Sequence, residues 1–202
     1  MPPAVAQEGG VGAAALLAKV RSCTQLSRGK YRTDDGARAS VPVCGMRGAV
    51  FWKADLDIDC DGQVSRQCNR RTDPYFQPTT AYQKANGQHL NPALLPYVVV
   101  PLPSRIWNAA GAGIRGGGVV AVIYRGRVEY AVVGDQGPSD LIGEASYATA
   151  RALGIDPDPV RGGVSGGVTY ILFKDSRVRP IESHRAAVVA GVGLAKRFLR
   201  AN

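Results

Sequence analysis

The sequence has no apolar run that approaches the ~20 residues that a membrane-spanning helix requires. The longest run, residues 93–100, is interrupted by Pro96. Residues 1–10 also lack the basic start and the apolar core of a secretory signal peptide. We therefore expect no membrane association, and an inference of secretion has to rest on the cysteines.

Runs of basic residues interleaved with aromatics, which favour nucleic-acid binding, are also missing. The chain carries a net charge of +9, from 25 Lys and Arg against 16 Asp and Glu. Its basic residues are scattered, and their densest groups lie near the two ends. A solvated basic surface explains this charge better than an anionic partner does, and we expect no nucleic-acid partner.

The four cysteines lack the C-x-x-C spacing of common metal sites, and both histidines lie far from them in sequence. Four cysteines permit three disulfide pairings, and we predict the local one, Cys23–Cys44 with Cys60–Cys68. Buried, reduced cysteines in a cytosolic protein are the alternative. Because disulfides persist in oxidising compartments, we predict a secreted protein, and we expect no metal or other cofactor.

Gly and Pro are abundant, with 25 and 13 residues, which favours short strands joined by turns. Residues 1–12 are predicted to be a flexible lead and residues 13–202 a single catalytic domain. The hydrophobic patterns predict an α+β, β-rich fold: a small barrel of about six strands flanked by two or three helices. The predicted strands are 48–61, 97–101, 119–124, 128–133 and 168–173, and the predicted helices are 12–23, 144–153 and 183–200.

An unusual acidic stretch occupies residues 55–62. On a strand, period two would place Asp55, Asp57, Asp59 and Asp61 on one face. Such a row of like charges is stable in solvent, around a cation or along a cationic ligand. An EF-hand that starts at Asp57 would need Glu at its twelfth position, which is Cys68, so the calcium-loop pattern fails.

A second acidic constellation joins a predicted strand to a predicted helix. Asp135 follows the hairpin strand and Glu144 opens the helix, with a loop rich in Gly and Pro between them. A pair of carboxyl groups brought together in this way is what glycosidases need. The alternative is structural: Asp135 makes a turn, and Glu144 complements the helix dipole.

Two further patterns fail on their context. Residues 111–116 match G-x-G-x-x-G but precede a predicted strand rather than the helix of a dinucleotide site. Residues 163–167 match G-x-S-x-G around Ser165, but a nucleophile elbow follows a strand, and this stretch precedes one. Ser165 is therefore predicted to be a loop serine.

Several separated segments, taken together, carry a resemblance to a known family. They are residues 51–62 (Phe-Trp-Lys-Ala-Asp-Leu-Asp-Ile-Asp-Cys-Asp-Gly), 73–77 (Asp-Pro-Tyr-Phe-Gln), 90–92 (Leu-Asn-Pro), 96–101 (Pro-Tyr-Val-Val-Val-Pro), 134–138 (Gly-Asp-Gln-Gly-Pro) and 142–146 (Ile-Gly-Glu-Ala-Ser). In this order they resemble the fungal-type chitosanases of glycoside hydrolase family 75. The resemblance covers residues 48–175, and several ordered motifs are more specific than any one of them.

The resemblance implies an endo-acting hydrolase that cleaves the β-1,4 bonds of chitosan, a glucosamine polymer, with inversion. It places the two essential carboxylates on Asp135 and Glu144, and the barrel would be of the double-psi type. Glu144 follows apolar Leu141 and Ile142, so we assign it as the general acid and Asp135 as the base. The predicted substrate-binding residues are Asp55, Asp57, Asp59, Asp61, Trp52, Tyr75 and Tyr147.

Two alternatives from other classes stay open at this point. One is a non-catalytic glycan-binding protein, in which aromatic side chains such as Trp52 and Tyr75 stack on sugars. The other is a serine esterase or deacetylase that uses Ser165. For the chitosanase we expect a monomer whose partner is its polysaccharide substrate, chitosan.

Overall fold

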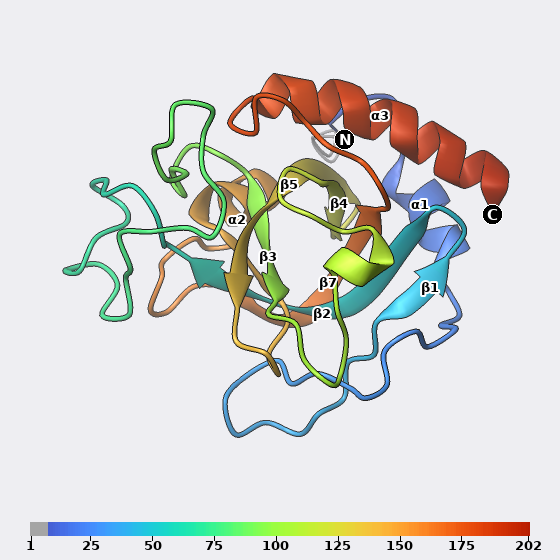
Figure 1. Ribbon diagram of the computed structural model, residues 1–202, viewed down its shortest axis with the longest axis horizontal. Coiled ribbons are helices and arrows are strands. Elements are labelled where there is room, and N and C mark those ends of the chain that lie inside the picture. The colour runs from blue at the N-terminus through green and yellow to red at the C-terminus, as the bar shows by residue number, and fades with distance from the viewer. Residues whose placement is uncertain (1–7) are drawn as a thin grey trace, which may run out of the picture.

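A computed structural model describes residues 8–202 of the chain (Figure 1). Residues 1–7 of the predicted lead lie outside the described residues. In chain order the elements are α1 (Ala13–Lys19), β1 (Cys44–Met46), β2 (Ala49–Asp59), β3 (Tyr97–Pro101), the 3₁₀ turn η1 (Ala110–Ala112), β4 (Val119–Tyr124), β5 (Arg127–Gly137), β6 (Glu144–Ser146), α2 (Tyr147–Leu153), β7 (Val164–Phe173) and α3 (His184–Ala201).

Six strands close into a barrel in the order β2-β6-β3-β5-β4-β7, because β7 pairs back onto β2. The seventh strand, β1, pairs with the first residues of β2. Two neighbouring pairs, β2–β6 and β3–β5, are parallel. In chain order, the first three barrel strands are β2, β3 and β4, and the last three are β5, β6 and β7. Exchanging the two sets one for one gives the same circular order of strands, a two-fold symmetry that a double-psi topology would show. The closed barrel with three α-helices confirms the predicted β-rich α+β fold.

Alternate residues of the six strands fill the barrel, and the other residues face outward. Inside, Trp52 stacks on Tyr170 with ring centroids 5.6 Å apart. Outside, α1 and α3 cover one side, where Phe198 packs edge-on against Phe173 at 6.2 Å. Each fully buried large side chain contributes ~1.5–3 kcal/mol, so both layers stabilise the barrel.

The hairpin of β4 and β5 is confirmed, with a two-residue turn at Arg125 and Gly126. Both turn residues have positive φ, 45° and 80°, as a type I′ turn requires. Strand β5 is longer than predicted. It continues from residue 133 to Gly137, because β3 pairs with it in parallel as far as Gly137.

The prediction that Glu144 opens a helix is wrong. Residues Glu144–Ser146 form β6, which pairs with the end of β2 through Asp57 and Glu144. Helix α2 begins only at Tyr147, where the Ser146 hydroxyl accepts a hydrogen bond from the Thr149 amide. The helix dipole is therefore not the reason for an acidic residue at position 144.

Both predicted disulfides, Cys23–Cys44 and Cys60–Cys68, are present. The terminal helix is also confirmed, with Ser183 as its N-cap. Strand β1 was not predicted, because only three residues of a polar segment form it and β2 supplies its partner. None of the helices in residues 8–202 is long and apolar enough to cross a membrane.

Candidate active site

A bulge in β5 turns Asp135 to the outside of the barrel. Val98 of β3 pairs with Val133, but the next residue, Val99, pairs with Asp135, so Gly134 is an extra residue in β5. Without it, period two would point Asp135 into the barrel with Val133. A side chain at Gly134 would lie 2.5 Å from the Cβ of Tyr97, so this position has to be glycine.

Glu144 lies on the same outer face. Its strand, β6, runs between β2 and β3, and the pair Val98–Ala145 places Glu144 beside Val99. A row across four strands therefore reads Asp57, Glu144, Val99 and Asp135. Asp135 and Glu144 are two strands apart, so their backbones are separated by roughly 9–10 Å.

Gly137 lies next to this row without a side chain of its own. A Cβ there would lie 2.7 Å from Oε2 of Glu144 and 3.0 Å from Cγ1 of Val99. Because Gly137 has no side chain, the Glu144 carboxyl group can lie in the space between β6 and β5. Gly137 was not singled out from the sequence, although it belongs to the quoted segment 134–138.

We expect Gly137→Ala to lower kcat at least ~10-fold, because the methyl group would push the Glu144 carboxyl group aside and small misplacements are costly in catalysis. Steady-state kinetics on soluble chitosan, the substrate that the sequence resemblance implies, would measure this, with the melting temperature as a check of the fold. Gly166→Ala is the matched control, since a Cβ there meets nothing within 4 Å. Equal kcat values for the two variants would contradict the expectation.

Two backbone amides hold the carboxylate of Asp135. Its Oδ1 accepts hydrogen bonds from Ala81 N at 2.7 Å and from Gln136 N at 2.8 Å. Burial raises the pKa of Asp135 above its ordinary value, while these two amides and the nearby His89 lower it. The amides thus favour an ionised carboxylate in a buried position. The Ala81 contact joins residues 54 apart, and nothing in the sequence indicated it.

Glu144 has a different environment. Burial raises its pKa to about 7, and the negative charges of Asp57, Asp135 and Asp61 add to the increase. At neutral pH it is therefore partly protonated, as a general acid must be. Glu144 thus suits a proton donor and Asp135 an ionised base, the two different roles that the carboxyl groups of a glycosidase have.

Asp57, Asp59, Asp61, Asp135 and Glu144 together make up the acidic face. Burial raises the pKa of Asp57, and the charge of Asp34 adds to the increase. Burial also raises the pKa of Asp59 and brings that of Asp61 to about 6, and for both the charge of Asp135 adds to the increase. Oxygen atoms of Asp59, Asp61 and Asp135 lie within 4.8 Å of one another, a group that could hold a cation. In residues 8–202 no Lys or Arg lies within 4.0 Å of a carboxylate of the acidic face. Its charges are left for a cationic ligand.

Two predicted substrate-binding residues are buried, and the prediction is wrong for both. Trp52 is 1% exposed inside the barrel, where it packs between Tyr170 and Trp107. Asp55 is 3% exposed, and its Oδ1 is packed against Gly143 without a hydrogen-bond partner. Burial raises the pKa of Asp55 to about 8, with Asp57 as the next cause.

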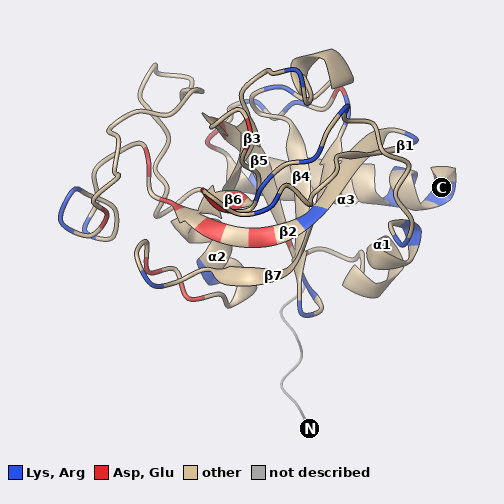
Figure 2. Cartoon of the chain, turned by 90° about the horizontal axis from the view of Figure 1, so that it is seen from below, with Lys and Arg blue, Asp and Glu red and all other residues tan. Residues whose placement is uncertain are grey.

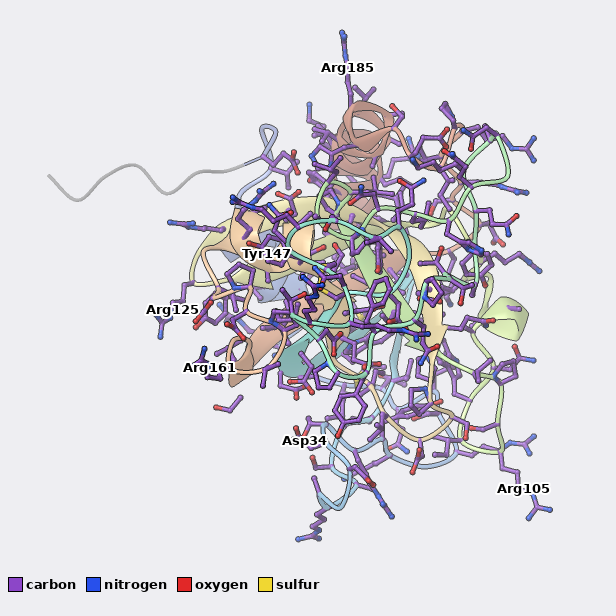
Figure 3. The ribbon with its side chains drawn as sticks, turned by 90° about the vertical axis from the view of Figure 1, so that its left-hand side faces the viewer. Asp34, Arg105, Arg125, Tyr147, Arg161 and Arg185 are labelled. Carbon is purple, nitrogen blue, oxygen red and sulfur yellow. A yellow bond between two sulfur atoms is a disulfide. The ribbon has the colours of Figure 1, made fainter. Side chains whose placement is uncertain are left out.

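The two predicted tyrosines are accessible. Tyr75 is 85% exposed in the long loop between β2 and β3. Tyr147 is half-buried at the start of α2, beside Phe76 and the disulfide Cys60–Cys68. Figure 3 shows Tyr147 on the side of the molecule that faces the viewer, with Asp34 below it. Both tyrosines remain candidates for contact with a ligand.

Ser165 lies in the exposed first part of β7 rather than in a loop. Among the described residues, both histidines have other partners: His89 contacts Thr80, and His184 contacts Glu8. Both histidines are thus engaged by other residues, and the esterase alternative gains no support from them.

The positive charges are spread over the molecule, whereas acidic residues gather on part of β2. Figure 2 shows acidic segments along the part of β2 next to β6, and basic segments on many other elements, including α1 and α3. A hollow of about 730 Å³ elsewhere on the surface is lined by Arg28, Arg105, Arg115 and Lys174, among others. Charges more than ~10 Å apart are largely screened at ordinary salt, so the face can attract cations despite the overall charge.

Comparison with known proteins connects this face to a family. The family model described as fungal chitosanase of glycosyl hydrolase group 75 matches residues 56–193. Among curated proteins, endo-chitosanase C of Aspergillus oryzae is 30% identical over 83% of this chain. Endo-chitosanase B of Aspergillus oryzae (strain ATCC 42149 / RIB 40) is 28% identical over 71% of it, and endo-chitosanase of Aspergillus fumigatus is 29% identical over 62%.

The chain spans 43% of the length of that endo-chitosanase C, 67% of endo-chitosanase B and 58% of the Aspergillus fumigatus protein. The family match begins in β2 and ends in α3, so it includes the end of β2 and both strands that carry Asp135 and Glu144. The matched range, residues 56–193, includes most of residues 48–175, which carry the resemblance seen in the sequence. The chain belongs to the fungal chitosanase family of glycosyl hydrolase group 75.

Proposed function

We propose that the protein is an endo-acting chitosanase that hydrolyses β-1,4 bonds between glucosamine units with inversion. The observation that carries the proposal is a pair of carboxyl groups, Asp135 and Glu144, on a face whose acids have no Lys or Arg partner among residues 8–202. Their backbones lie two strand spacings apart, which gives the side chains room for the ~6.5–9.5 Å between the carboxyl groups of an inverting pair.

In this mechanism Glu144 donates its proton to the glycosidic oxygen as the bond to the anomeric carbon breaks. Asp135 takes a proton from a water molecule that attacks the anomeric carbon from the opposite side. Val99 lies between the backbones of the two catalytic residues. The amides of Ala81 and Gln136 keep Asp135 oriented as the base.

The remaining acids of the face support a polycationic substrate. Chitosan amines are largely protonated below neutral pH, and no Lys or Arg among the described residues competes for Asp57, Asp59 or Asp61. We also propose that Tyr75 and Tyr147 contact the polymer. The two disulfides support a secreted protein, and we propose that it acts as a monomer.

We expect Asp57→Asn and Asp59→Asn to raise KM on chitosan severalfold while kcat changes less, because each removes attraction for a sugar amine and not a proton-transfer group. The control is Asp175→Asn, which changes an 80%-exposed side chain whose one ion pair within residues 8–202 is with Arg115. Loss of turnover with unchanged KM at position 57 or 59 would instead place that residue in the chemistry.

Incubation with soluble chitosan tests the function as a whole. A rapid fall in viscosity before many reducing ends appear would show endo-cleavage, and proton NMR of the first anomer would report inversion or retention. Binding without cleavage would select the glycan-binding alternative. Release of acetate, inhibited by a serine-directed phosphonate, would select the esterase with Ser165.

A further inference from the structure

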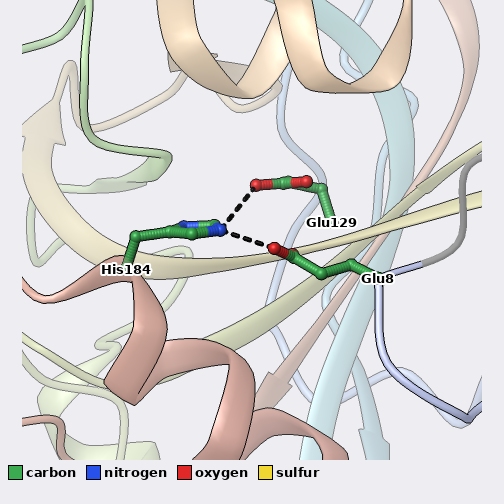
Figure 4. Close-up of side chains that lie close together, drawn as sticks. All are labelled: Glu8, Glu129 and His184. Carbon is green, nitrogen blue, oxygen red and sulfur yellow. Dashed lines mark hydrogen bonds and ion pairs between the residues drawn. The ribbon is translucent and has the colours of Figure 1, made fainter.

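A second group of ionisable side chains lies away from the acidic face. Nε2 of His184 is 2.5 Å from Oε1 of Glu8 and 3.5 Å from Oε1 of Glu129 (Figure 4). One oxygen of each glutamate and the imidazole nitrogen all lie within 4.8 Å of one another. The residues come from the N-terminal segment, from α3 and from β5, and all three side chains point to one spot.

The group has more negative charge than its protein partners balance. Glu129 has a side chain that is only 9% exposed, and Glu8 lies close to it. Among residues 8–202, His184 is the only basic side chain within 4.0 Å of either carboxylate. A protonated His184 would neutralise one of the two charges and leave the other. A divalent cation bound to a neutral imidazole would balance both.

Burial raises the pKa of Glu129, and the charge of Glu8 is the next cause. The hydrogen bond to Glu8 raises the pKa of His184. Both directions agree with the geometry, which holds two carboxylates close to one imidazole.

We propose that Glu8, Glu129 and His184 form a site for a divalent first-row transition-metal ion such as Zn²⁺. One imidazole nitrogen and two carboxylate oxygens are donors that Zn²⁺ accepts, and Ca²⁺ or Mg²⁺ would favour oxygen donors alone. Donors around tetrahedral Zn²⁺ lie roughly 3.4 Å apart. The distance of 3.5 Å between His184 Nε2 and Glu129 Oε1 already fits. Oε1 of Glu8, at 2.5 Å from the same nitrogen, would have to move away from it by roughly 1 Å.

The surroundings support such a site. Oε2 of Glu8 accepts a hydrogen bond from the Tyr130 amide at 2.9 Å, which orients this carboxylate from the far side. His184 and Glu8 are partly exposed, at 33% and 23% of their side chains, so an ion can enter and a water can take the fourth position. Glu129 and Asp135 are six residues apart on β5, roughly 20 Å along the strand, which separates this site from the acidic face.

A bound ion would tie the N-terminal segment to α3 and β5. We therefore expect the full chain, freed of metal by EDTA and dialysed, to bind one equivalent of Zn²⁺ by calorimetry. The melting temperature should rise by roughly 5–10 °C at a Zn²⁺ concentration about 100-fold above Kd.

Glu129→Gln and His184→Ala should each weaken Zn²⁺ binding more than tenfold and abolish the shift in melting temperature. Glu8→Gln tests the same point outside the core if Glu129→Gln fails to fold. The controls are His89→Ala, which removes the other histidine of the chain, and Glu182→Gln, near the start of α3. Wild-type protein without stoichiometric binding, or unchanged binding by His184→Ala, would overturn the site. Neither result depends on activity toward chitosan.

Discussion

Asp135→Asn and Glu144→Gln should each lower kcat on chitosan by ~10²–10⁴-fold, the contribution expected of a general acid or base. Both substitutions keep the size of the side chain and remove its ability to exchange a proton. Asn at position 135 can still accept hydrogen bonds from Ala81 N and Gln136 N, so the fold should be preserved. Reducing-end assays under saturating substrate would measure the loss.

The pH dependence assigns the two roles. Glu144 has a pKa of about 7, so wild-type kcat should fall above that pH as the general acid loses its proton. At low pH, protonation of Asp135 should limit the rate. Asp175→Asn should match the wild type at every pH. Near-normal turnover of either carboxylate variant in folded protein would rule out the pair, whatever the pH profile.

We expect the melting temperature to fall by roughly 10 °C between pH 5 and pH 8. Burial raises the pKa of Asp55 to about 8, that of Glu144 to about 7 and that of Asp61 to about 6. Their unfolded-state values lie near 4, so the folded protein binds more protons over this range. By linkage its stability is full below about pH 4 and is lost as pH rises through the folded-state values.

Asp55 should account for much of this slope, since burial raises its pKa further than that of Glu144 or Asp61. Asp55→Asn should therefore flatten the pH dependence and raise the melting temperature at pH 8. Differential scanning calorimetry from pH 4 to pH 9 measures both effects. A melting temperature that is equal at pH 5 and pH 8, or that rises, would contradict this. It would show that the buried acids are ionised in the folded protein and that other groups balance their charge.

The site illustrates how far local patterns carry. The alternation in residues 48–61 predicted the strand, and the order of short motifs indicated the family. Yet the same alternation placed Asp55 in a solvated row with Asp57 and Asp59. The structure buries Asp55 against Gly143, because the end of β2 is covered by the chain that leads into β6. The period-two alternation predicts which face of a strand a side chain lies on, but not which residues pack against that face.

Local sequence determined the elements that local interactions form. The hairpin of β4 and β5, helix α3, the stop of α2 at Gly154 and the two disulfides all follow from near neighbours and turn chemistry. The acidic character of residues 55–61 and the candidate pair Asp135 and Glu144 were also evident, because composition and motif order do not depend on packing.

Only the tertiary structure decided how these groups meet. Strand β6 exists because β2 and β3 supply its partners, so a segment that resembles a helix start becomes a strand. The bulge at Gly134 turns Asp135 outward, and the distant amide of Ala81 holds it there. Glu8 and His184 lie 176 residues apart in sequence but in contact in the fold. Barrel closure brings remote segments together, and no local pattern records which side chains will then share one environment.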